Sequence, residues 1–88
     1  MARLKVQDAA KARGVNLSEL QMRVSTRMGR VVPLGTIRRY WYSTKKGLAQ
    51  GEPIELVDVY LLGTIARALD VPVAELLNEA ELGQKKAA

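Results

Sequence analysis

The sequence predicts an all-α fold, a single compact domain of five short helices. Apolar residues recur at the three- and four-residue spacing of one helix face in several segments, and proline or glycine separates these segments. With 88 residues and no cysteine, the chain has room for one modest core and has no disulfide framework. We expect residues 1–82 to form the domain and residues 83–88 to be a disordered tail.

The first two helices have clear end signals. We expect the first over residues 3–13, where Gly14 ends it in a left-handed turn. The second is expected over residues 17–28, because Asn16 is a favourable N-cap and Glu19 follows it three residues later, as in a capping box. One face of this helix carries the apolar residues Leu17, Leu20, Val24 and Met28.

A third helix is expected to begin at Pro33, because a proline at the first helical position loses no hydrogen bond. Its inward face would hold Leu34, Ile37 and Trp41. We expect Tyr40 to join Trp41 in the core; the alternative is that both rings are exposed for stacking. The opposite side would present Thr36, Arg39 and Ser43, with Gly35 and Tyr42 near it and Arg38 on its flank.

Residues 43–53 are expected to form a loop that turns at its glycines. The fourth helix would run over residues 54–69, with Glu55 and Asp58 in its first turns, where the helix dipole favours acids. Its buried side would hold Leu61, Leu62, Ile65, Ala66 and Leu69. Gly63 lowers helix stability by about 1 kcal/mol relative to alanine, so we expect close packing there.

The fifth helix is expected to begin at Pro72 and to end near Gly83. Val73, Leu76 and Leu77 would point inward from it.

The charge of the chain is strongly segregated. The net charge is +5, yet residues 21–50 carry seven cations and no acid, whereas residues 52–82 carry seven acids and one cation, Arg67. A basic middle followed by an acidic end suggests that one surface faces a polyanion. Histidine and cysteine are absent, which argues against a zinc site, a cofactor and an enzyme. No apolar run is long enough for a membrane span, and we expect a cytoplasmic protein.

Two segments resemble a known family. Residues 65–77, I-A-R-A-L-D-V-P-V-A-E-L-L, and residues 12–20, A-R-G-V-N-L-S-E-L, are similar to the lambda-repressor-like (Cro-type, XRE) helix-turn-helix family. Residues 36–40, T-I-R-R-Y, also resemble a short motif of MerR-type regulators. The chain departs from the first family in its longer connections over residues 25–33 and 43–54, and in Leu17, where many members have a glutamine that binds phosphate.

The resemblance implies a sequence-specific transcriptional regulator that binds double-stranded DNA as a homodimer, with its third helix in the major groove. Arg39 suits bidentate recognition of guanine. Arg38 either contacts DNA or pairs with an acid of the fourth or fifth helix. Lys45 and Lys46 suit phosphate contacts. The candidate DNA-binding residues are Thr36, Arg38, Arg39, Tyr42, Ser43, Lys45, Lys46, Arg30 and Arg27.

Two other functions compete with this interpretation. The chain can be an interaction module, such as an antitoxin or an adaptor, that binds a partner protein through its apolar and acidic C-terminal half, which would also hold the dimer interface. It can also bind single-stranded nucleic acid if Tyr40, Trp41 and Tyr42 are exposed for stacking on bases.

Overall fold

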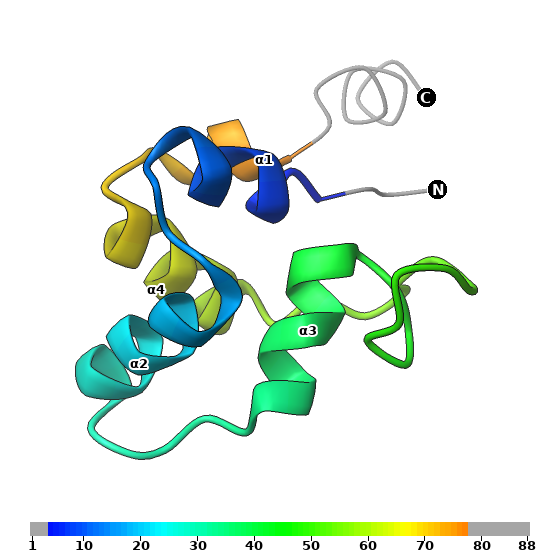
Figure 1. Ribbon diagram of the computed structural model, residues 1–88, viewed down its shortest axis with the longest axis horizontal. Coiled ribbons are helices and arrows are strands. Elements are labelled where there is room, and N and C mark those ends of the chain that lie inside the picture. The colour runs from blue at the N-terminus through cyan, green and yellow to red at the C-terminus, as the bar shows by residue number, and fades with distance from the viewer. Residues whose placement is uncertain (1–3, 78–88) are drawn as a thin grey trace.

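The computed structural model describes residues 4–77 and has four α-helices followed by one turn of 3-10 helix (Figure 1). The elements are α1 (Val6–Ala12), α2 (Leu17–Met28), α3 (Leu34–Tyr42), α4 (Val59–Leu69) and η1 (Val73–Leu76). The predicted all-helical fold is confirmed, and within the described range pairing of the strand type is limited to two isolated bridges. None of the helices in residues 4–77 combines the length and apolar character that crossing a membrane requires.

The core is built where the predicted apolar faces meet. The helix α2 packs against α3 and α4, while α1 packs against α3, α4 and η1. Leu20 and Val24 of α2 are fully buried, as predicted, and Leu17 and Met28 lie at the edge of the core. The predicted buried side of α4 is also confirmed, since Leu61, Leu62, Ile65, Ala66 and Leu69 are all buried.

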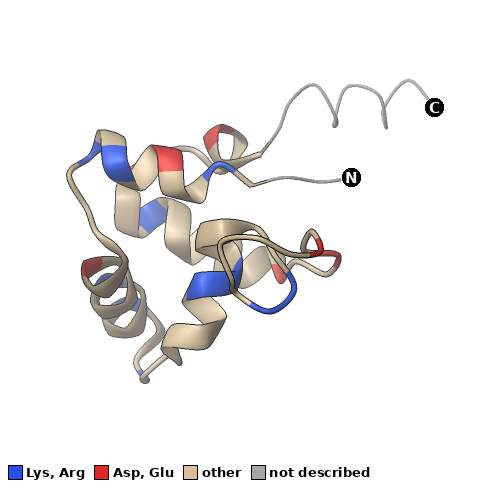
Figure 2. Cartoon of the chain, turned by 45° about the vertical axis from the view of Figure 1, so that its right-hand side comes forward, with Lys and Arg blue, Asp and Glu red and all other residues tan. Residues whose placement is uncertain are grey.

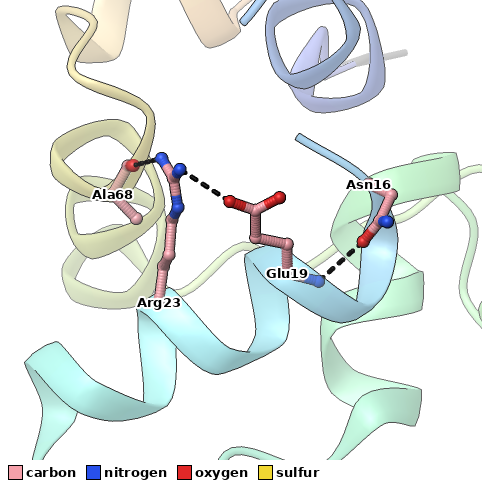
Figure 3. A network of polar contacts seen from close by, with 4 residues as sticks. All are labelled: Asn16, Glu19, Arg23 and Ala68. Atoms are coloured by element: carbon pink, nitrogen blue, oxygen red, sulfur yellow. Dashed lines mark hydrogen bonds and ion pairs between the residues drawn. The ribbon is translucent and has the colours of Figure 1, made fainter. Parts of the chain in front are cut away.

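The start of α2 is fixed by a side-chain cap. The Asn16 Oδ1 accepts a hydrogen bond from the Glu19 amide at 2.8 Å, as expected of an N-cap. The Glu19 carboxylate does not close a capping box but pairs with the Arg23 guanidinium at 2.7 Å (Figure 3). Arg23 also donates to the carbonyl of Ala68 at 3.2 Å, which satisfies a carbonyl in the last turn of α4 and ties that helix to α2.

The five-residue connection between α2 and α3 is held by side chains of α2. Gly29 ends α2 in the left-handed conformation, with φ 73°. The Ser25 Oγ then accepts from the Val32 amide at 2.9 Å, and the Gln21 amide group donates to the Val32 carbonyl at 2.9 Å. The Val32 side chain is also buried. Its backbone hydrogen bonds to α2 and its buried side chain together fix the position of the chain just before α3.

The fourth helix starts later than predicted. The helix α4 begins at Val59, and Asp58 is its N-cap, accepting from the amides of Tyr60 and Leu61 at 2.9 and 3.2 Å. The prediction that Glu55 lies in the first helical turn is therefore wrong. The reason is tertiary: Ile54 is buried, and its amide donates to the carbonyl at the end of α3, which keeps this segment extended.

The predicted first and fifth helices are shorter than expected. The helix α1 begins at Val6, because the chain before it makes an antiparallel bridge between Leu4 and Leu77. In place of the fifth helix, the described residues have the single turn η1, which buries Leu76 but leaves Val73 exposed. The prediction that Val73 points inward is wrong, because one short turn brings only its last residue into the core. The end of the predicted fifth helix and the predicted tail lie outside the described residues.

Gly63 does not have the close packing that we predicted. A Cβ atom at this position would meet no atom within 4 Å outside the backbone of its own helix. The packing within the chain therefore does not explain this glycine.

Candidate nucleic-acid interface

The third helix is anchored by the side chains predicted to be inward. Ile37 is fully buried, and Tyr40 and Trp41 are 2% and 7% exposed, so the core interpretation of both rings is confirmed. The Tyr40 hydroxyl also accepts a hydrogen bond from the Asp58 amide at 2.8 Å, which fixes the segment before α4 to the back of α3. Arg38 is exposed on the other side of the helix.

The end of α3 differs from the prediction at Ser43. This residue is the left-handed C-cap of the helix, with φ 60°, and it is only 6% exposed. Its Oγ accepts a hydrogen bond from the buried Leu4 amide at 2.9 Å. The prediction that Ser43 lies on the outward face is wrong, because the chain leaves the helical path at this residue and turns the side chain inward.

A loop covers part of the face of α3 that lies opposite the core. Gly47 is buried, and a Cβ atom there would lie 3.0 Å from the Arg38 Cβ, 3.2 Å from the Gly35 carbonyl oxygen and 3.3 Å from the Arg39 amide. We call residues 43–54 the covering loop. It lies beside α3 in Figure 1 and passes in front of it in the turned view of Figure 2.

The covering loop is closed at its base by backbone and side-chain contacts. Thr44 and Pro53 form an antiparallel bridge, and the Lys45 amide donates to the Glu52 carbonyl at 2.9 Å. The Thr44 hydroxyl donates to the Leu48 carbonyl at 2.7 Å. These contacts hold the loop in the position that brings Gly47 against α3.

Arg39 therefore lies partly under the covering loop. Its side chain is half-buried, and its Nε is buried without a hydrogen-bond partner in the described part of the chain. A buried donor without an acceptor is unfavourable by about 1–3 kcal/mol. Arg39 lies on the face of α3 opposite the core, as predicted. The prediction that this face is open to solvent at Arg39 is wrong, because the covering loop packs on it.

Lys45 is held by two acids, Glu52 near the end of the covering loop and Glu55 just after it. Its Nζ lies 2.8 Å from a Glu55 carboxylate oxygen and 3.4 Å from one of Glu52. The hydrogen bond to Glu55 and then that to Glu52 hold the pKa of Lys45 above its ordinary value. The predicted phosphate contact of Lys45 would have to compete with these two ion pairs.

Four other cations among the predicted site residues stay exposed: Arg27, Arg30, Arg38 and Lys46. Within residues 4–77 no ion pair joins Arg38 to an acid, so its predicted alternative role is not found there. Figure 2 shows basic segments on α3 and on the loop that covers it. Thr36 and Tyr42 are half-buried, and Tyr42 packs against the core. We call the four exposed cations the basic set.

The sequence did not indicate two features of this region. Nothing in the run K-K-G distinguishes Gly47, which contacts α3, from an ordinary turn glycine. The exposure of Val59 and Tyr60 was also not predicted, although both lie off the apolar stripe of α4.

This region is a basic surface, and the nearest acids along the chain after it are those of residues 52–58. In residues 4–77, no three acidic side chains gather in a way that would hold a metal ion. Comparison of the chain with protein-family models, with curated proteins and with solved structures finds no match in any of the three.

Proposed function

We propose that the protein is a sequence-specific transcriptional regulator that binds double-stranded DNA, with α3 directed at the major groove. The observation that carries the proposal is the concentration of cations from the second turn of α2 through α3 into the covering loop, where residues 21–50 contain seven cations and no acid. Two packed helices joined by a short, fixed connection also support it, because a helix-turn-helix uses such a pair to present its second helix.

The covering loop limits which part of α3 would reach the bases. Gly35 is exposed in the first turn, Thr36 is half-buried beside it, and Arg38 is exposed one turn later. These residues would approach base edges first, with Arg38 as the bidentate partner of a guanine. Phosphates on the two sides of α3 would be contacted by Lys46, in the covering loop, and by Arg30, in the connection before α3.

Arg39 would contribute after a small movement of the loop. Its Nε has no acceptor in the free protein, and a base or phosphate oxygen would supply one. The loop would then be displaced in the complex, and the guanidinium of Arg39 would reach guanine or the backbone. Direct readout by Arg38 does not depend on this movement.

A single copy would bind weakly. If Arg27, Arg30 and Lys46 supply three phosphate contacts, the logarithm of the binding constant falls with the logarithm of salt concentration with a slope of about −3. Useful specificity from so small a surface requires two copies on a symmetric site, so a homodimer on a palindromic operator is part of the proposal.

The test begins with selection of bound duplexes from a random-sequence library by the full chain, followed by fluorescence anisotropy on the enriched sequence. We expect Arg38→Ala to weaken binding to the selected duplex by about tenfold or more and to relax the preference at one base pair. We expect Lys46→Ala to weaken all duplexes similarly and to reduce the salt slope by about 1.

The matched control is Lys11→Ala, which removes one exposed cation from α1, away from the proposed surface. It should change affinity for the selected duplex little. Equal losses in Arg38→Ala and Lys11→Ala, or a failure to enrich any motif, would contradict sequence-specific binding through α3. Tighter binding to single strands than to duplexes would contradict it as well.

A further inference from the structure

The start of α4 carries an uncovered apolar surface. Val59 and Tyr60, in the first turn of α4, are 77% and 68% exposed, and Leu56, three residues before the helix, is 81% exposed. The opposite side of α4 is the most apolar part of the core, so these three residues do not serve the packing of the chain itself. Large apolar side chains gathered on one exposed surface are a feature of interaction sites.

Gly63 lies on the same side of α4, one turn after Val59. A side chain there would meet nothing within 4 Å, so no neighbour in the chain requires a glycine. Glycine weakens a helix relative to any ordinary residue. A glycine next to exposed apolar residues permits another backbone to approach the helix closely. Contact with another chain therefore explains this glycine, whereas contacts within one chain do not.

The charges at the two ends of α4 suit antiparallel pairing with a second α4. The exposed Asp58 carboxylate lies at the start of the helix, and the exposed Arg67 lies one turn beyond Gly63. If two such helices cross antiparallel at their Gly63 residues, Arg67 of each copy lies opposite the Asp58 end of the other. Opposite charges then face each other at both ends of the contact.

We propose that the outer surface of α4, made by Val59, Tyr60, Gly63 and Arg67 together with Leu56 just before the helix, docks on the same surface of a second copy of the chain. The two α4 helices run antiparallel about a two-fold axis near Gly63. The interface is therefore isologous, which means that both copies contribute the same residues to it. The proposal rests on the exposed side of α4 alone and holds whether or not the protein binds DNA. It places the interface on α4, within the C-terminal half that we expected to hold it, and not on Leu76, which is buried within the chain.

Sedimentation equilibrium of the full chain over a wide concentration range tests the proposal. We expect a reversible monomer–dimer equilibrium, and we expect Gly63→Gln and Tyr60→Lys each to raise the dissociation constant of the dimer by about tenfold or more. Arg67→Glu should raise it too, because it places acid opposite acid. At a concentration where the monomer prevails, Gly63→Gln should raise the melting temperature, because glutamine favours a helix more than glycine does.

The control is Gly35→Gln, since Gly35 is also a helical glycine at which a Cβ atom would meet nothing within 4 Å. This variant should gain stability as Gly63→Gln does but leave the dissociation constant of the dimer unchanged. A wild-type chain that stays monomeric over the whole concentration range would overturn the proposal. The exposed surface would then be a site for a different partner protein. A dimer that responds equally to the two glutamine substitutions would also overturn it.

Discussion

Ser43 connects two distant parts of the chain through one hydroxyl group. Its Oγ accepts from the buried amide of Leu4, and its backbone takes the left-handed conformation. Ser43→Ala leaves that amide without an acceptor, so we expect the free energy of unfolding in urea to fall by about 1–3 kcal/mol. Ser43→Gly loses the same hydrogen bond but adopts the left-handed conformation without strain, so its loss should be smaller.

The control for this pair of variants is Ser18→Ala, at an exposed position of α2. It should change the free energy of unfolding by no more than about 0.5 kcal/mol. A loss in Ser43→Ala no larger than that of the control would mean that the Leu4 amide finds another acceptor. DNA affinity should be unchanged in Ser43→Ala at temperatures where the variant is folded, since the hydroxyl faces the core.

Single residues were predictable from sequence where their role is local. Asn16 caps a helix that follows it directly, and Gly29 ends the same helix, so neighbouring residues suffice to recognise both. Ser43 was misplaced because a helical wheel assumes that the helix continues, and the chain turns at this residue. Arg39 was placed on the correct face, but its cover comes from a glycine eight residues later whose position no local pattern reveals.

Among the elements, the covering loop is the one whose packing most affects the proposed function. Gly47 adopts a φ of 76° and lies against α3, where a Cβ atom would come within 3.0 Å of the Arg38 Cβ. Gly47→Ala should therefore destabilise the protein and lift the loop from α3. We expect a loss of about 1–3 kcal/mol in the free energy of unfolding, and faster hydrogen exchange of the Lys45 and Ile54 amides that close the loop.

Gly29→Ala provides the comparison for this variant. Gly29 has nearly the same φ, 73°, but a Cβ atom there would meet nothing within 4 Å. The difference in stability between the two variants measures the contact of the loop with α3, without the backbone strain that both share. Equal losses would mean that the loop does not rest firmly on the helix.

Elements were predictable where signals at both ends agree. The helix α2 has a capping residue before it and a glycine after it, and its predicted bounds are confirmed. The helix α4 was expected to begin at residue 54, with Glu55 and Asp58 in its first turns, because the helix dipole favours acids there. What decides the true start is the hydrogen bond between the Ile54 amide and the Ser43 carbonyl, a contact between residues far apart in sequence.

At the scale of the whole molecule, the chain separates its two proposed surfaces by charge. The basic set lies on α2, α3, the connection between them and the covering loop, whereas the outer side of α4 begins among the acids of residues 52–58. The overall segregation was readable from the sequence, because it needs only the order of the residues. The outward position of Leu56, Val59 and Tyr60 was not, because it depends on where α4 starts and which side of it enters the core.

If both proposals hold, DNA binding and self-association are linked. A duplex with two half-sites recruits two copies that also contact each other, so the dimer interface contributes to affinity there but not on a duplex with one half-site. We expect Gly63→Gln to weaken binding to the two-site duplex by about tenfold while leaving single-site binding unchanged. Arg38→Ala should weaken binding to both duplexes and leave the dissociation constant of the free dimer unaltered. Anisotropy titrations on the two duplexes measure these affinities, and sedimentation of the free proteins measures the dissociation constant of the dimer. If Gly63→Gln lowers affinity for both duplexes to the same degree, α4 acts on the DNA-binding surface directly, and the two proposed surfaces are not independent.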